Sequence, residues 1–124
     1  MTQDLFAAVL DKSERTVKPR AYGLTIALDT GLGVRHAQDL VEVSGAHCDY
    51  VKIAWGSSLI TGNLEAKLDV YRKGGLQPMI GGTLFEYAFL HGKLDELLAL
   101  VKDTKFHIEV SDGTFPISRP RRER

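Results

Sequence analysis

Four strand-like segments alternate with helical segments, and this alternation is the strongest constraint on the fold. Strands are predicted within YGLTIALD, CDYVKIAW, LQPMIGG and FHIEVSD, because each is short, rich in aliphatic or aromatic residues and bounded by turn-forming residues. Helical periodicity is predicted at about 34–44, 63–73 and 84–102, with a break near Gly92. Crossovers of this length join parallel strands, so the order β-α-β-α-β-α-β predicts an α/β protein.

The length of 124 residues has room for one domain, and we expect residues 1–124 to form a single one. A short helix is predicted at 4–12, ahead of the first strand. Pro19 favours an extended approach to that strand, because the residue before a proline avoids the helical region.

Side chains alternate along a strand, which gives each predicted strand an apolar and a polar face. In the first strand the apolar set is Tyr22, Leu24, Ile26 and Leu28, and the opposite set is Gly23, Thr25, Ala27 and Asp29. The second strand opposes Val51, Ile53 and Trp55 to Lys52. A doubly wound sheet needs apolar residues on both faces, whereas a barrel has helices only outside and charges near its mouth. We therefore favour a (β/α) barrel, or a piece of one, with Trp55 packed outward.

Composition narrows the class of protein. Lysine and arginine total 16, as do aspartate and glutamate, so no net charge steers the chain to nucleic acid or to a membrane. The basic RPRRER tail is interpreted as a solvated end, and Cys48, the sole cysteine, fits a reducing compartment. The sequence contains no apolar run of membrane-spanning length and no signal-peptide pattern. We expect a cytoplasmic protein that acts on small molecules, without nucleic-acid or membrane partners.

Charged side chains on the predicted polar face are candidates for chemistry. Asp29, Lys52, Glu109 and Ser111 fall on that face, and Asp112 lies just beyond the fourth strand. Converging carboxylates at the mouth of a barrel favour Mg²⁺, which takes oxygen ligands and often contacts a substrate phosphate. A buried ion pair between Lys52 and one of the acids is the structural alternative. The candidate metal ligands are therefore Asp29, Glu109 and Asp112, and the spacing leaves open which of them bind.

The stretch MIGGTLFEYA carries a second candidate site. Thr83 and Glu86 have the spacing of a capping box at the start of a helix. Gly81 and Gly82 would let a ligand approach the backbone there, where free N–H groups attract anions. Gly81, Gly82, Thr83 and Ser111 are thus the candidate substrate-binding residues. The four histidines show no paired spacing, so we do not expect a zinc site.

Four motifs, in order, resemble one family. KPRAYGLTIALDTGL, DYVKIAWGSS, GGTLFEYAFLHGK and IEVSDGT are similar to the phosphosulfolactate synthase family, over about Arg15 to Ile117. The resemblance implies a Mg²⁺-dependent (β/α)8 barrel, a lyase that adds sulfite to phosphoenolpyruvate to give phosphosulfolactate, the opening step of one route to coenzyme M. Relatives in plants are linked to heat tolerance instead.

The resemblance also implies roles for residues. Asp29, Lys52, Glu109 and Asp112 would lie around substrate and metal, with Lys52 as the catalytic candidate, while Gly82 and Thr83 would line the same mouth.

The match is partial, which leaves the activity open. A complete barrel takes about 250 residues, so we expect a half-barrel formed by the first four βα units. The family's proposed proton-donating lysine belongs to a segment expected after Ser118 and is absent from this sequence. A homo-oligomer that completes the barrel is one expectation. The alternatives are a catalytically inactive, truncated half-barrel that serves as a binding or stress-related protein, and another Mg²⁺-dependent lyase or aldolase of barrel type.

Overall fold

A computed structural model describes residue 9 and residues 15–115 of the chain. Apart from residue 9, the helix predicted at 4–12 lies outside this part, as does the RPRRER tail.

The sheet has four strands, each within a segment where the sequence predicts one. They are β1 (Ile26–Asp29), β2 (Tyr50–Ile53), β3 (Gln77–Ile80) and β4 (His107–Ile108). The strands pair in the order β1-β2-β3-β4, and every pair is parallel. The prediction of an α/β protein with a parallel sheet is therefore confirmed, and β1 and β4 are the edges of the described sheet.

The helices also follow the predicted periodicity. They are α2 (Val34–Ser44), α3 (Ser57–Ile60), α4 (Leu64–Lys73), α5 (Gly82–Leu90) and α6 (Leu94–Thr104), with a 3-10 turn, η1 (Gly45–His47), after α2. The break predicted near Gly92 separates α5 from α6, where Gly92 has a φ of +66° that favours glycine. The sequence does not predict α3, because four residues are too few to show a period.

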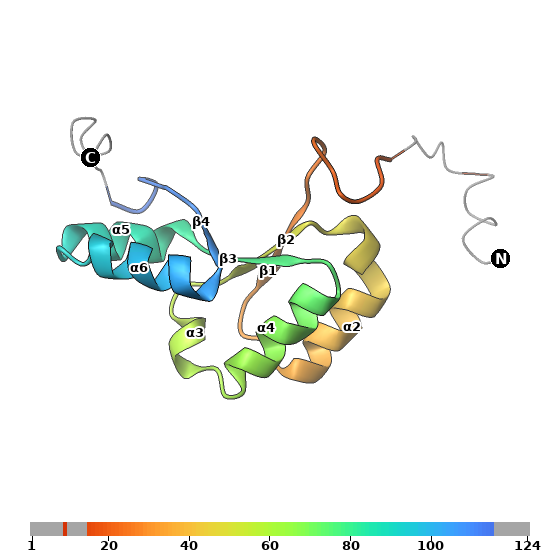
Figure 1. Cartoon of the computed structure of the whole chain (residues 1–124), viewed down its shortest axis with the longest axis horizontal. Coiled ribbons are helices and arrows are strands. Elements are labelled where there is room, and N and C mark those ends of the chain that lie inside the picture. The colour runs from red at the N-terminus through yellow and green to blue at the C-terminus, as the bar shows by residue number, and fades with distance from the viewer. Residues whose placement is uncertain (1–8, 10–14, 116–124) are drawn as a thin grey trace.

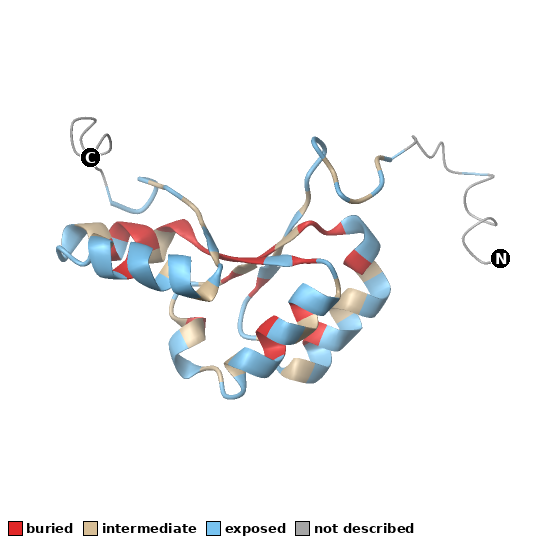
Figure 2. Cartoon of the chain, viewed as in Figure 1, coloured by how far each residue is buried: buried red, intermediate tan, exposed pale blue. Residues whose placement is uncertain are grey.

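Two apolar clusters hold the helices to the sheet. Helices α2 and α4 lie together on one side of it, and α5 and α6 form a second pair beside β4 (Figure 1). The first cluster contains Ala37, Cys48, Val51, Ile53, Leu68, Tyr71 and Leu76, and the second contains Ile80, Ala88 and Leu97. Figure 2 shows buried residues along the central strands and on the helices.

The two faces of β1 are the reverse of the predicted ones. Leu28 aligns with Lys52 on the open face of the sheet, whereas Asp29 aligns with Ile53 on the helix-covered face. Asp29 is completely buried, while Leu24, Ile26 and Leu28 are 49%, 53% and 55% exposed. The physical reason is that α4 supplies polar partners for Asp29. For β2 the prediction is right, because Val51 and Ile53 are buried among the helices.

An arginine holds the segment before β1 to the amino end of β2. The Arg20 guanidinium pairs with Asp49 at 2.8 Å, and it also donates to the Ala46 carbonyl. The second Asp49 oxygen accepts from the Thr25 amide at 2.8 Å. In the part of the chain that the structure describes, no helix is long and apolar enough to cross a membrane.

Candidate functional site

A cavity of about 220 Å³ lies at the carboxyl ends of β2, β3 and β4. Its lining consists of Leu28, Lys52, Ala54, Trp55, Gly81, Gly82, Thr83, Glu109 and Ser111. Six of these residues are candidates that the sequence singles out: Lys52, Gly81, Gly82, Thr83, Glu109 and Ser111. The structure therefore brings the predicted catalytic and substrate-binding residues into one place.

Three lining residues are not among the sequence candidates. Alternation along the first strand puts Leu28 on the wrong face, and Ala54 directly follows β2 without any polar group to mark it. The sequence predicts outward packing for Trp55, but this residue is 50% exposed and its ring lies 5.3 Å from that of Tyr87. The signal in the sequence for these residues is their position, since residues that follow parallel strands gather at one edge of the sheet.

Lys52 and Glu109 form an ion pair in the cavity. Nζ of Lys52 lies 2.9 Å from Oε2 of Glu109, and the side chains are 31% and 39% exposed. The Glu109 amide continues the pairing with β3, because it donates to the Ile80 carbonyl at 3.0 Å. Both charges are thus fixed by the sheet and remain accessible to a ligand.

Gly82 allows the β4 side of the cavity to approach the start of α5. A Cβ at Gly82 would lie 2.4 Å from Cβ of Ser111 and 3.3 Å from a Glu109 carboxylate oxygen. The first of these distances is too short for carbon atoms, so a side chain at this position would displace Ser111. Gly81 caps α5 in an extended conformation without a side-chain hydrogen bond.

The predicted capping box is wrong. Thr83 lies inside α5, and its hydroxyl is 3.4 Å from that of Thr114. Glu86 is completely buried and accepts hydrogen bonds from the Ser111 hydroxyl and from the amides of Thr114 and Phe115. The Ser111 hydrogen bond is the main cause that lowers the pKa of Glu86 below its usual value. Glu86 therefore acts on the segment after β4 and not on the start of its own helix.

Asp29 does not join the other predicted metal ligands. Its Oδ1 accepts from the amides of Gly31 and Leu32 at 2.8 and 2.7 Å, and its Oδ2 contacts the Tyr71 hydroxyl at 2.7 Å and Lys67 Nζ at 3.0 Å. Burial raises the pKa of Asp29, but these hydrogen bonds outweigh burial and the net pKa is lowered. Both carboxylate oxygens are engaged on the helix side of the sheet, so the residue serves the fold.

The remaining predicted ligands are two carboxylates. Glu109 lines the cavity, and Asp112 is an exposed residue that follows Ser111. Among residue 9 and residues 15–115, no group of three or more histidine, cysteine, aspartate or glutamate side chains is arranged to hold a metal ion. Within this part of the chain, Glu109 and Asp112 are the carboxylates among the predicted ligands that remain for a metal at this cavity.

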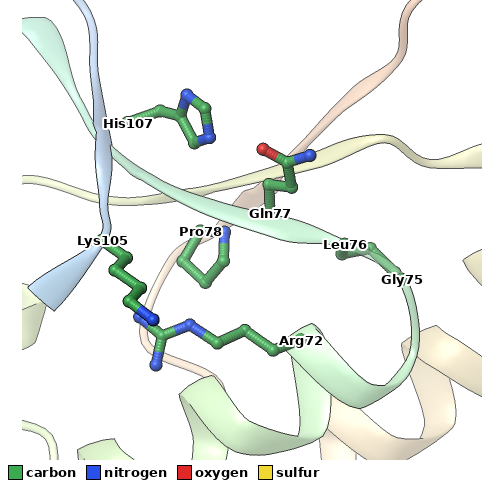
Figure 3. Close-up of a pocket in the computed structure, with 7 residues that line it drawn as sticks. All are labelled: Arg72, Gly75, Leu76, Gln77, Pro78, Lys105 and His107. Atoms are coloured by element: carbon green, nitrogen blue, oxygen red, sulfur yellow. The ribbon is translucent and has the colours of Figure 1, made fainter. Parts of the chain in front are cut away.

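A second cavity, of about 430 Å³, lies at the amino ends of β3 and β4 (Figure 3). Arg72 and Lys105 reach toward each other there, from α4 and from the residue after α6. The Arg72 guanidinium already donates to the Thr104 carbonyl at 2.7 Å and lies over the Phe106 ring. Glu65 and Asp103 line the adjoining depression and offset the positive charge. The positive charge of this cavity is therefore balanced within the fold, and we assign no ligand to it.

Comparison with known proteins places these motifs in a family. The family model for (2R)-phospho-3-sulfolactate synthase (ComA) matches residues 13–124. Phosphosulfolactate synthase of Methanothermobacter thermautotrophicus is 38% identical over 106 residues, which are 83% of this chain and 41% of that protein. The enzyme of the same name from Methanocaldococcus jannaschii is 38% identical over 104 residues, which are 82% of this chain and 41% of that protein. The phosphosulfolactate synthase of Bacillus subtilis is 34% identical over 112 residues, which are 88% of this chain and 44% of that protein. The chain spans less than half the length of these relatives.

Proposed function

The chain belongs to the phosphosulfolactate synthase family, and we propose on this basis that it carries part of a Mg²⁺-dependent site that adds sulfite to phosphoenolpyruvate. The observation that supports this most directly is the accessible Lys52–Glu109 pair in a cavity at the carboxyl ends of parallel strands. In barrel enzymes that end of the strands carries the chemistry.

The substrates are anions, and Lys52 supplies the cavity with a positive charge. Sulfite forms a carbon–sulfur bond to the terminal carbon of phosphoenolpyruvate, and the electron pair of the double bond moves toward the substrate carboxylate. A proton must then be delivered to the adjacent carbon. We assign to Lys52 the binding of the anions and the stabilisation of the charge that develops on the carboxylate. Gly81 and Gly82 leave room for substrate beside the backbone.

The carboxylates that remain at the cavity fit the usual coordination of Mg²⁺ in proteins. Mg²⁺ is commonly bound through one or two carboxylates, with substrate phosphate and water as its other ligands. Glu109 and Asp112 are the carboxylates proposed to hold it, and Asp29 is left out because its oxygens are engaged elsewhere. When bound, the ion would help to stabilise the negative charge of the enolate-like state.

We further infer that the four strands are consecutive strands of a larger barrel. The sheet is wholly parallel and in sequence order, and α2 and α4 cover one of its faces while the cavity opens on the other. The relatives are more than twice as long as the part that this chain matches. The 124-residue chain taken alone is proposed to self-associate through its open sheet face.

The experiment is a titration of the chain with phosphoenolpyruvate in the presence and absence of Mg²⁺, followed by an assay for phosphosulfolactate after sulfite is added. Lys52→Met should weaken phosphoenolpyruvate binding at least about tenfold, since a hydrogen bond to a charged group stabilises by roughly 1.5–3 kcal/mol. Lys93→Met is the matched control, because Lys93 is an exposed lysine outside the cavity, in the turn between α5 and α6.

The outcomes separate the proposal from its alternatives. Equal affinities of Lys52→Met and the unchanged chain would exclude the role of Lys52. Absence of phosphoenolpyruvate binding by the unchanged chain would overturn the proposed site. Binding without product would favour a ligand-binding protein that lacks lyase activity. Light scattering of the same sample measures the mass of the chain in solution, and a monomeric mass would refute self-association.

A further inference from the structure

Glu86 is a buried carboxylate whose hydrogen-bond donors, among the described residues, all come from one distant segment. The side chain is 0% exposed, although it lies on a helix beside the cavity. Oε1 accepts from the Ser111 hydroxyl, while Oε2 accepts from the amides of Thr114 and Phe115 at 3.0 and 2.6 Å. A buried charge is costly unless it is hydrogen-bonded. The donors therefore stabilise the Glu86 carboxylate, and the carboxylate in turn holds the segment that carries them.

The segment Ser111–Phe115 is tied to α5 through these hydrogen bonds. It follows β4 without regular secondary structure, and its residues from Asp112 to Phe115 are exposed. Within the segment, the Gly113 amide donates to the Ser111 hydroxyl oxygen at 3.2 Å. The Ser111 hydroxyl thus makes two hydrogen bonds: it accepts one from Gly113 within the segment and donates one to Glu86 on α5.

Ser111, the first residue of this segment, lines the cavity, and so do Gly82 and Thr83 at the start of α5. Gly82 lies so close to Ser111 that a Cβ on it would clash, and the Thr83 hydroxyl is 3.4 Å from that of Thr114. Glu86 stands one helical turn further along α5. The position of Ser111 at the cavity, and of Asp112 beside it, therefore depends on how firmly α5 holds the segment.

We propose that Glu86 is a positioning residue, whose carboxylate clamps Ser111–Phe115 to α5 and so fixes Ser111 and Asp112 at the rim of the cavity. The effect on ligand binding rests on the proposed function, but the clamp itself does not. A glutamine at this position has the same size but carries no charge and only one acceptor oxygen. Either its amide nitrogen faces the N–H groups of Thr114 and Phe115, or its oxygen stays there and its nitrogen turns to the Ser111 hydroxyl. In both cases the hydrogen bonds to the two amides are weaker, because a hydrogen bond to a charged acceptor is roughly twice as strong as a neutral one.

The test is amide hydrogen exchange, measured by NMR on the complete 124-residue chain without ligand. In Glu86→Gln, the amides of Thr114 and Phe115 should exchange at least tenfold faster, while the amide of Ile53 in the central sheet keeps its rate. Glu96→Gln is the matched control, because Glu96 is an exposed glutamate on the neighbouring helix. Unchanged exchange at Thr114 and Phe115 in a folded Glu86→Gln variant would overturn the clamp.

A second variant decides the matter if Glu86→Gln does not fold. Ser111→Ala removes one donor and leaves the carboxylate in place, so the amides of Gly113 and Thr114 should exchange several-fold faster. Exchange equal to that of the unchanged chain would overturn the proposal in this case.

A measurement of ligand affinity then tests whether the clamp affects the candidate site. Phosphoenolpyruvate with Mg²⁺ should bind at least tenfold more weakly to Glu86→Gln, with the same helical CD signal. Equal affinity would show that the segment's order has no bearing on the site. If the unchanged chain binds no phosphoenolpyruvate, the proposed function fails, whereas the exchange data still judge the clamp.

Discussion

The Tyr71 hydroxyl donates a 2.7 Å hydrogen bond to Oδ2 of Asp29, a residue 42 positions earlier in the chain. Both side chains are completely buried. The other Asp29 oxygen accepts from the amides of Gly31 and Leu32, so one carboxylate connects α4 to the loop that follows β1. The loop after β1 is therefore set by a helix that the chain forms later.

Removing the Tyr71 hydroxyl should destabilise the protein. Tyr71→Phe deletes a buried hydrogen bond to a charged acceptor, so the free energy of unfolding should fall by about 1.5–3 kcal/mol in urea denaturation. Tyr50→Phe is the control, because Tyr50 is a partly exposed tyrosine whose ring contacts that of His107. Equal unfolding midpoints for the two variants would contradict this prediction.

Two lysines on α4 should differ sharply in their importance. Lys67 is fully buried against Asp29 and also donates to the Leu32 carbonyl, whereas Lys73 pairs with Asp69 at the surface. Lys67→Met leaves a buried carboxylate without its cation and should cost about 3–5 kcal/mol. Lys73→Met should cost at most about 1 kcal/mol. Thermal unfolding of both variants is the measurement, and similar melting temperatures would disprove the difference.

Stability should decline at both ends of the pH scale, for opposite reasons. The lowered pKa of Asp29 means that its contribution is complete above the ordinary value of 3.8 and is lost as the pH falls through the folded-state pKa. Burial and the adjacent Asp29 raise the pKa of Tyr71, so its contribution is complete below 10.0 and is lost at higher pH. Melting temperatures of Tyr71→Phe should lack the alkaline decline, and an identical alkaline profile would refute this assignment.

Gly82 should tolerate no side chain. Gly82→Ala places a methyl group 2.4 Å from Cβ of Ser111, and the resulting shift should cost about 1–3 kcal/mol of unfolding free energy. Gly62→Ala is the matched control, because a Cβ there meets no atom within 4 Å. An unchanged urea midpoint for Gly82→Ala would show that Ser111 can move away from α5 without a loss of stability.

Glu109 should matter more to metal than to folding. The Lys52–Glu109 pair is partly exposed, so Glu109→Gln should change stability by at most about 1 kcal/mol. The Mg²⁺ affinity of the Glu109→Gln variant, measured by calorimetry with phosphoenolpyruvate present, should fall. Glu42→Gln is the control, because Glu42 is exposed on α2 and this variant should keep the Mg²⁺ affinity of the unchanged chain. A large loss of structure without a change in Mg²⁺ affinity would make Glu109 a structural residue.

The strand and helix positions could be read from the sequence because they depend on local periodicity. Helix α2 occupies the predicted range of 34–44, and the four strands lie within the quoted segments. Which face of a strand is covered depends instead on distant residues. Alternation separates Leu28 from Asp29, but only the partners on α4 decide that the aspartate is the buried one.

The candidate site shows the same division. Residues that end neighbouring parallel strands converge by topology, so the gathering of Lys52, Gly82 and Glu109 could be predicted. The role of Glu86 could not, because its spacing from Thr83 matches a local capping pattern while its partners lie 25 to 29 residues away. A local pattern offers no information about a contact of that range.

The exposed side chains of Leu24, Ile26 and Leu28 also affect how this chain responds to heat and denaturant. In a monomer these side chains are already hydrated, so its unfolding transfers less new apolar surface to water than it would from a fully covered sheet, whereas self-association through this face would cover them. The heat-capacity increment of unfolding and the denaturant m value both scale with that newly exposed surface. Both quantities should therefore be small for a monomeric chain of 124 residues, which gives a stability curve that changes little with temperature.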